Sequence, residues 1–232
     1  MNPENADSIR LNKHLALQLG LSRREADNYI AQKRVNVNGA VAELGSRILP
    51  GDTVLVDDKP IADKTDLIYI LLNKPTNYVS SRRPQGDTPT IYSLLPKEYH
   101  VLKPVGRLDK NTSGAILLTN DGDFAFRMTH PKFNKVKVYQ VQLDKDLEPL
   151  HQQMIADYGV TLEDGVSKLA LTRLNDDDRR EWTVTMSEGR NRQIRRTFAS
   201  LGYEVRTLHR TNFGNYALGD IRVGEYQLVD ML

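Results

Sequence analysis

The sequence contains no cysteine, which excludes disulfide bonds, thiolate metal ligands and a cysteine nucleophile. It has no apolar run of membrane-spanning length, and its first residues, MNPENADSIR, lack the basic and apolar pattern of a secretory signal. We therefore expect a cytoplasmic protein, monomeric by default, whose residues 1–8 are disordered. Its 232 residues, 39% of them hydrophobic, suffice for one sizeable core and a small second domain.

Patterns for metal and nucleotide chemistry are also missing. No glycine-rich phosphate loop followed by Lys-Ser/Thr is present. The acidic run 176–178 is flanked by two arginines, which favours a solvated hairpin loop over a metal site. The histidines are scattered, without metal-ligand spacing, at His14, His100, His130, His151 and His209. An enzyme of this composition would work with carboxylate, arginine and tyrosine, with no metal and no cofactor.

Charge is distributed unevenly, although the net charge is only +2. Residues 188–210 carry six arginines against two glutamates, whereas residues 144–164 are strongly acidic. A basic face opposed by an acidic one is typical of a protein that binds a phosphate backbone. The alternative is ordinary solvated charge on separate helices.

Residues 9–57 predict two short helices followed by strands. Gly20 ends the first helix, and Ser22 with Glu25 forms the capping box of the second. Asn38-Gly39 is a hairpin signal. The pieces LNKHLA, SRREADNYI, VNVNG and PGDTVLV resemble, in this order, the small S-four-type RNA-binding domain. The alternative is a generic helix-hairpin unit with a basic surface. Phosphate contacts would come from Arg23, Arg24, Lys33 and Arg34.

Residues 58–66 are expected to be a linker, and residues 67–232 a second domain. Its strand patterns mostly alternate and outnumber its helices. The stretch RNRQIRRTFASLGYE predicts a helix that Asn191 caps and Gly202 closes. We therefore expect an α+β fold with a mixed, largely antiparallel central sheet and flanking helices.

Four motifs of this second domain occur in a specific order: ILLNKP, GRLDKNTSG, KVYQV and EGRNRQIRR. Together they resemble the pseudouridine synthases of ribosomal RNA, in the branch with an S-four-type domain in front. The resemblance covers about residues 9–230. It implies isomerisation of a flipped-out uridine, without cofactor, in ribosomal RNA or a pre-ribosomal particle. The segments NTSG and HPKFNKVKVYQV are closer to the large-subunit members.

The resemblance also implies roles for individual residues. Asp109 would be the catalytic nucleophile, with Arg195 as its salt-bridge partner. Tyr139 would stack on the extruded uracil, and Leu208 would pack beneath it. Arg107 would take the place of the departed base.

Other residues are assigned supporting or binding roles. Lys74 lies in a motif beside the site and is grouped with the substrate-binding residues as a support. Asn77 stands where the family usually has glycine, and asparagine tolerates the left-handed backbone such a turn needs. Further RNA contacts are expected from Arg190, Arg192 and Arg196.

The runner-up hypothesis is a non-catalytic RNA-binding factor for ribosome assembly. Both kinds of protein would carry basic patches and bind RNA in a salt-sensitive way. The joint presence of Asp109, Tyr139 and Arg195 favours the enzyme.

Overall fold

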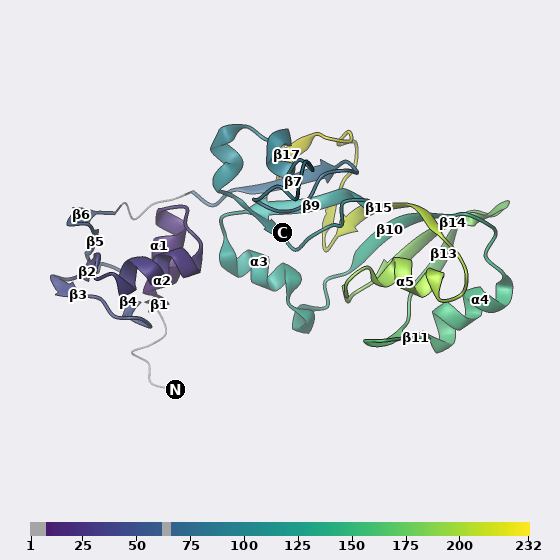
Figure 1. Ribbon diagram of the computed structural model, residues 1–232, viewed down its shortest axis with the longest axis horizontal. Coiled ribbons are helices and arrows are strands. Elements are labelled where there is room, and N and C mark those ends of the chain that lie inside the picture. Colours follow the sequence, from purple (N-terminus) through teal and green to yellow (C-terminus); the bar gives the residue numbers. More distant parts are fainter. Residues whose placement is uncertain (1–7, 62–65) are drawn as a thin grey trace. The chain divides into compact units, whose positions relative to one another are not determined.

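The computed structural model describes residues 8–61 and 66–232. Seven of the eight N-terminal residues predicted to be disordered, and positions 62–65 of the predicted linker, lie outside the described residues. The chain divides into two compact units. One contains the described residues up to 68 together with 120–122, and the other contains 69–119 and 123–232 (Figure 1).

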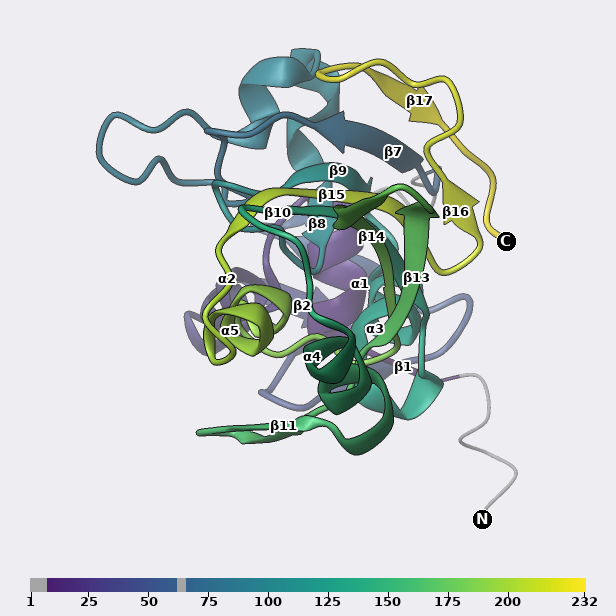
Figure 2. The ribbon, with the colours of Figure 1, turned by 90° about the vertical axis from the view of Figure 1, so that its right-hand side faces the viewer.

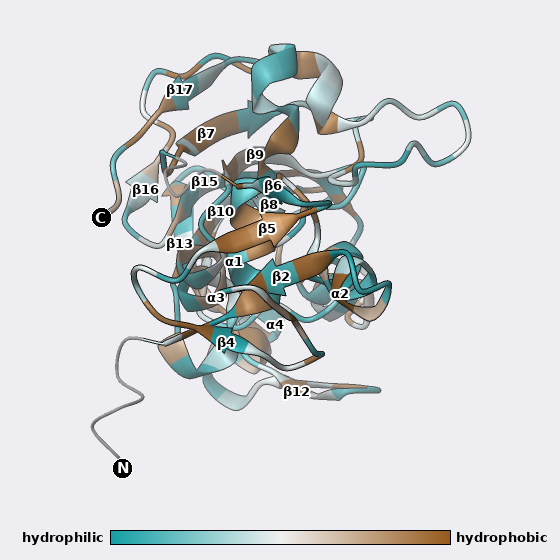
Figure 3. Cartoon of the chain, turned by 90° about the vertical axis from the view of Figure 1, so that its left-hand side faces the viewer, coloured by the Kyte–Doolittle hydropathy of each residue, from teal (hydrophilic) through white to brown (hydrophobic). Residues whose placement is uncertain are grey.

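The small N-terminal unit packs two helices against short strands. Its core is formed by apolar residues of both helices and of several strands, among them Leu11, Leu15, Ile30 and Val35. Strand β5 is entirely hydrophobic (Figure 3). The elements are α1 (Leu11–Gln18), α2 (Arg23–Ala31), the four-stranded sheet β3-β2-β5-β6 (Ala40–Val41, Val35–Val37, Val54–Val56, Lys59–Pro60) and the pair β1-β4 (Ile9–Arg10, Arg47–Ile48).

Two local predictions for this unit are confirmed. The Ser22 hydroxyl accepts a hydrogen bond from the Glu25 N–H at 3.1 Å, and the Glu25 carboxylate accepts one from the Ser22 N–H at 2.6 Å. This reciprocal pair satisfies two of the free N–H groups at the start of α2. Asn38 and Gly39 both adopt positive φ, 51° and 84°, in the turn between β2 and β3. The predicted linker starts later than expected, because Lys59–Pro60 pairs with β5.

The larger unit is built on one nine-stranded sheet with the order β13-β14-β10-β15-β9-β7-β17, extended by β16 on β15 and β8 on β9. All its strand pairs are antiparallel except β15 with β9. The predicted α+β class and the mixed, largely antiparallel sheet are therefore confirmed. The strands are β7 (Tyr69–Lys74), β8 (Lys103–Val105), β9 (Ser113–Thr119), β10 (Lys137–Leu143), β13 (Ala170–Asn175), β14 (Asp178–Met186), β15 (Val205–Phe213), β16 (Tyr216–Ala217) and β17 (Tyr226–Leu228).

Helices flank the two halves of this sheet. In Figure 1, α3 (Gly122–Thr129) lies along the β7–β9 half, and α5 (Gln193–Ala199) along the half that contains β10 and β14. α4 (Pro149–Gln153) continues into a π-helical turn, Met154–Tyr158. The separate hairpin of β11 (Val160–Leu162) and β12 (Gly165–Ser167) extends away from the sheet (Figure 2).

The parallel junction between β9 and β15 joins the two halves of the sheet. Gly114 pairs with Arg210 there, and its φ is +109°. A Cβ atom at position 114 would lie 2.2 Å from the backbone oxygen of Arg210, closer than any real contact. Only glycine allows the two strands to approach this closely. The functional site lies at this junction.

Candidate active site

A pocket of about 540 Å³ opens at the junction of β9 and β15. Its walls come from four parts of the larger unit: the loop between β8 and β9, the end of α3, the pocket-facing side of β10 and β15, and the segment that leads into α5. Its lining residues include Arg107, Asp109, Tyr139, Arg192, Leu208 and Arg210. Sequence positions separated by a hundred residues therefore meet in one cavity.

Asp109 lies on the loop before β9, and its side chain is 37% exposed. Its Oδ2 lies 3.7 Å from Nη1 of Arg192. Arg192 precedes α5 in a left-handed conformation, with φ 47° and ψ 31°. It occupies the N-cap position without making a side-chain cap, so the prediction that Asn191 caps this helix is wrong. The left-handed turn brings Arg192 to the pocket wall.

The predicted ion pair between Asp109 and Arg195 is not formed in the described structure. Arg195 instead donates from Nη1 to the Val205 carbonyl and from Nη2 to the Asn111 carbonyl, both at 2.7 Å. Burial and the nearby charge of Arg192 lower the pKa of Arg195. Its two bonds connect the Asp109 loop to the start of β15, and the charge of Asp109 opposes the lowering of the Arg195 pKa.

Lys74, at the end of β7, binds the backbone of the loop that carries Asp109. Its side chain is completely buried, and its ammonium donates to the carbonyls of Pro75 (2.8 Å), Asp109 (3.2 Å) and Thr112 (2.8 Å). Burial lowers the pKa of Lys74 to about 8, although the charge of Asp109 opposes this shift. Grouping Lys74 with the substrate-binding residues is therefore corrected, because its ammonium bonds to the loop backbone and does not reach the pocket surface.

Two further residues fix the loop. Asn77 adopts the expected left-handed conformation, with φ 67°, and its N–H donates to the Lys110 carbonyl at 2.8 Å. The Ser80 hydroxyl donates to the Leu108 carbonyl at 3.0 Å and accepts from the Leu108 N–H at 3.2 Å. With Lys74 and Arg195, these contacts fix the backbone of the loop that carries Asp109.

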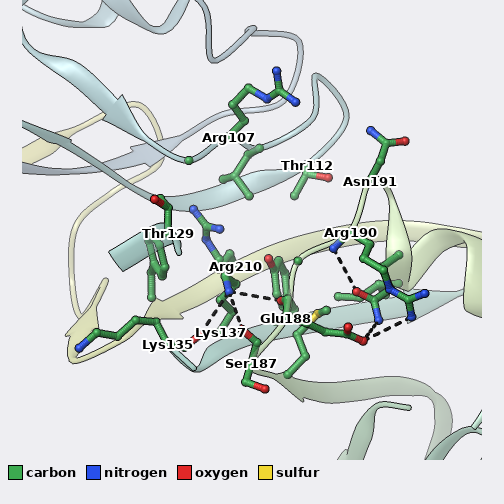
Figure 4. Close-up of a pocket in the computed structure, with 18 of the residues that line it drawn as sticks. Arg107, Thr112, Thr129, Lys135, Lys137, Ser187, Glu188, Arg190, Asn191 and Arg210 are labelled. Atoms are coloured by element: carbon green, nitrogen blue, oxygen red, sulfur yellow. Dashed lines mark hydrogen bonds and ion pairs between the residues drawn. The ribbon is translucent and has the colours of Figure 1, made fainter. Parts of the chain in front are cut away.

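The floor of the pocket is formed by apolar and basic side chains of β10 and β15. Tyr139 and Leu208 are buried, with 8% and 7% exposure, and both line the pocket. Arg107 is exposed, and its side chain extends away from Arg210 (Figure 4). The pocket therefore brings together Asp109, Tyr139, Leu208 and Arg107, as the sequence motifs predict, but it excludes Arg195 and Lys74.

Sequence reasoning missed Arg210, which lies on the same floor. It faces Tyr139 across the β10–β15 pairing, with the guanidinium carbon 6.0 Å from the Tyr139 ring centre. The alternation of β15 places residues 208 and 210 on one face. Leu208 is predicted to pack beneath the base, so the two-residue spacing from Leu208 to Arg210 is the signal that could have identified Arg210.

Several predicted RNA contacts are instead occupied within the protein. Arg190 and Arg196 both bind Asp164, at 2.9 and 2.7 Å, and connect the tip of the β11–β12 hairpin to the start of α5. The hydrogen bond from Arg196 lowers the pKa of the Asp164 carboxyl. Arg34 pairs with Asp57 and lies 3.9 Å over the Tyr29 ring. All three guanidinium groups pair with acidic residues that are distant in sequence, and their contact with RNA stays a prediction.

The other arginines and the lysine predicted to contact RNA are exposed. Arg23, Arg24 and Lys33 are exposed on the small unit. Arg192 remains 46% exposed beside Asp109. Within residues 8–61 and 66–232, no group of three or more acidic or histidine side chains could hold a metal ion. In the same part of the chain, no helix is long and apolar enough to cross a membrane.

The candidate site is thus a carboxylate on a fixed loop, beside a pocket with apolar side chains on its floor and arginines at its rim. Sequence comparison identifies the class. The profile described as RNA pseudouridylate synthase matches residues 68–200, and the S4 domain profile matches residues 9–54. The chain belongs to the pseudouridine synthase family, in the branch that carries an N-terminal S4 domain.

Three curated relatives match nearly the whole chain. The dual-specificity RNA pseudouridine synthase RluF of Escherichia coli (strain K12) is 36% identical over 95% of this chain and 75% of its own length. The ribosomal large subunit pseudouridine synthase B of Bacillus subtilis (strain 168) is 33% identical, over 93% and 90%. The ribosomal small subunit pseudouridine synthase A of Pasteurella multocida (strain Pm70) is 37% identical, over 94% and 95%.

A solved structure gives the same result. A crystal structure of pseudouridylate synthase superposes with a TM-score of 0.68, at 32% identity over 96% of both chains. This agreement over both units confirms the predicted class of enzyme and its fold.

Proposed function

We propose that this protein converts a uridine of ribosomal RNA to pseudouridine, and that Asp109 is the nucleophile. The observation that supports this most directly is the half-exposed Asp109 carboxylate, which lines the pocket on a loop held by Lys74, Asn77, Ser80 and Arg195. A carboxylate nucleophile is most effective when it is ionised and fixed in direction. The Arg192 guanidinium lies 3.7 Å from Oδ2 of Asp109.

The proposed reaction needs no external atoms. The bond between uracil N1 and ribose C1′ breaks, a bond between C5 and C1′ forms, C5 loses its proton and N1 gains one. The product is therefore an isomer of the substrate. Tyr139 and Leu208 offer the apolar faces against which the extruded base lies, and Arg107 is exposed at the rim, where its guanidinium plane can stack in the vacated position.

We propose that the target lies in large-subunit ribosomal RNA and is modified in the cytoplasm. The support is the NTSG and HPKFNKVKVYQV segments, which are closer to large-subunit members. Pseudouridine mapping in ribosomal RNA from cells with and without the gene tests this directly. One missing pseudouridine in the large subunit is expected, and a loss confined to the small subunit would contradict the assignment.

The catalytic proposal is tested by tritium release from RNA labelled at uracil C5. The wild-type protein should release tritium, and Asp109→Asn should slow release by at least about a thousandfold while still binding the RNA. Asp220→Asn removes an exposed carboxylate outside the pocket and serves as the matched control. Binding without release by the wild-type protein, on every ribosomal RNA, would overturn the proposal.

A further inference from the structure

Arg210 is a buried cation without an anionic partner. Its side chain is 3% exposed, and its Nε donates to the Ala115 carbonyl at 2.7 Å. Its Nη2 is buried and has no hydrogen-bond partner, and no carboxylate in the described part of the chain forms an ion pair with Arg210. An unsatisfied guanidinium in such a position is costly unless a ligand supplies the missing acceptor. Arg210 lines the same pocket as Asp109.

A second cation adds to the positive charge at this place. Lys137 donates from Nζ to the carbonyls of Lys135, Ser187 and Glu188, at 3.2, 3.0 and 3.3 Å (Figure 4). Burial, and then the neighbouring charge of Arg210, lower the pKa of Lys137. The Glu188 carboxylate does not neutralise Arg210, because it bonds to Arg190 and Gln193. The pocket floor therefore attracts a group that accepts hydrogen bonds and tolerates or develops negative charge.

The neighbours of Arg210 indicate what carries this group. Leu208 lies two residues earlier on the same strand face, Tyr139 is opposite, and the Phe213 ring centre is 4.6 Å from the guanidinium carbon. These flat apolar surfaces suit a base better than a phosphate. A base seated between them presents its polar edge in its own plane. A guanidinium carries only donors, so it can bind a uracil carbonyl oxygen and not the N3–H group.

We propose that Nη2 of Arg210 donates a hydrogen bond to O2 or O4 of the flipped uracil. This inference rests on the proposed function and adds the residue that reads the base edge. If the carboxylate attacks C1′, the electron pair of the broken N1–C1′ bond leaves on uracil and is shared by O2 and O4. If it adds to C6, the electron pair of the C5–C6 double bond moves onto O4. In both routes the negative charge develops on a carbonyl oxygen that a guanidinium can stabilise without giving up its proton.

The test uses the full-length protein and a ribosomal RNA fragment that spans the mapped uridine. The target is uridine, 2-thiouridine or 4-thiouridine, because sulfur accepts hydrogen bonds more weakly than oxygen. Product formation is followed by nucleoside mass spectrometry, in single turnovers at saturating RNA. Arg210→Met removes the donors and keeps much of the bulk, and Arg210→Lys keeps the charge if the first variant unfolds. Arg206→Met, an exposed position on the same strand, is the matched control.

We expect Arg210→Met to slow the uridine reaction by about ten- to a hundredfold, the range for loss of a hydrogen bond to a charged group. One of the two thio substitutions in the RNA should lower the single-turnover rate of the wild-type protein and of Arg206→Met. The same substitution should change the rate of Arg210→Met by less than about twofold. The proposal is overturned by a wild-type rate in Arg210→Met, by an equal thio effect in both proteins, or by no thio effect in the wild type. Loss of RNA affinity with an unchanged rate at saturation would assign Arg210 to a phosphate instead. An inactive wild-type protein would point to the failure of the proposed function itself.

Discussion

The buried ammonium of Lys74 provides a prediction in which activity and stability change in opposite directions with pH. In the folded protein its pKa is about 8, against 10.5 for a solvated lysine side chain such as that of the unfolded chain. Between these values the unfolded state holds one proton more than the folded state, so raising the pH stabilises the fold. The gain is about 1.4 kcal/mol per pH unit, and roughly 3 kcal/mol over the whole interval.

Activity should decrease over the same interval. The charged ammonium has three N–H donors for three carbonyls, whereas the neutral amine has two. Deprotonation therefore removes one bond from the loop that carries Asp109. We expect the single-turnover rate of the wild-type protein to fall with a midpoint near pH 8. Lys74→Met should have a low rate at every pH and a free energy of unfolding lower by about 2–4 kcal/mol at pH 7, because three carbonyls lose their donor.

Urea denaturation and tritium release, each from pH 7 to 10, measure the two effects. The difference in unfolding free energy between the wild type and Lys74→Met should grow with pH, while the difference in rate shrinks. An alkaline loss of rate that originates in the RNA would be common to both proteins. Lys97→Met, at an exposed position, controls for the loss of one lysine charge. A stability difference that narrows with rising pH, or the same alkaline limb in Lys74→Met, would refute the reasoning.

Three further outcomes are expected. Gly114→Ala places a Cβ atom against the β15 backbone and should lower the free energy of unfolding in urea by more than about 3 kcal/mol. Gly122→Ala, at a position with open space around it, should change it by less than about 0.5 kcal/mol. Equal losses of stability in the two variants would disprove the close approach of β9 and β15. Ser22→Ala removes the capping box and should weaken hydrogen-exchange protection of α2 by about 1 kcal/mol, an effect that is contradicted by unchanged exchange. Reversing the charge of Arg23 and Arg24 should reduce the slope of log RNA affinity against log salt concentration by about 1–2. The single-turnover rate at saturating RNA should not change, and a large loss of that rate would argue against a role confined to binding.

Features encoded by neighbouring residues could be predicted from sequence. The capping box at Ser22 and the turn at Asn38-Gly39 depend on side-chain chemistry within four residues, and both form as expected. The strand alternation that predicted a largely antiparallel sheet is equally local. Asn77 also takes the left-handed conformation for which its short polar side chain is suited.

Partners separated by long stretches of chain could not be predicted in this way. Whether Arg192 or Arg195 meets Asp109 depends on the left-handed turn before α5, which no residue pattern signals. Arg190 and Arg196 look like RNA contacts in the sequence because Asp164 lies on a hairpin more than twenty residues away. Arg210 was overlooked because a charged residue on an alternating strand is normally assigned to solvent, whereas here the opposite strand and Phe213 bury it.

The parallel pairing of β9 with β15 has a consequence for synthesis of the protein on the ribosome. Residues 113–119 emerge from the exit tunnel some ninety positions before their partner strand, and the gap cannot close until residue 210 is available. A truncated nascent chain that ends before Val205 consequently lacks the floor against which a base lies, however well its β7–β9 half has folded. The pocket therefore cannot be completed until β15 has been translated.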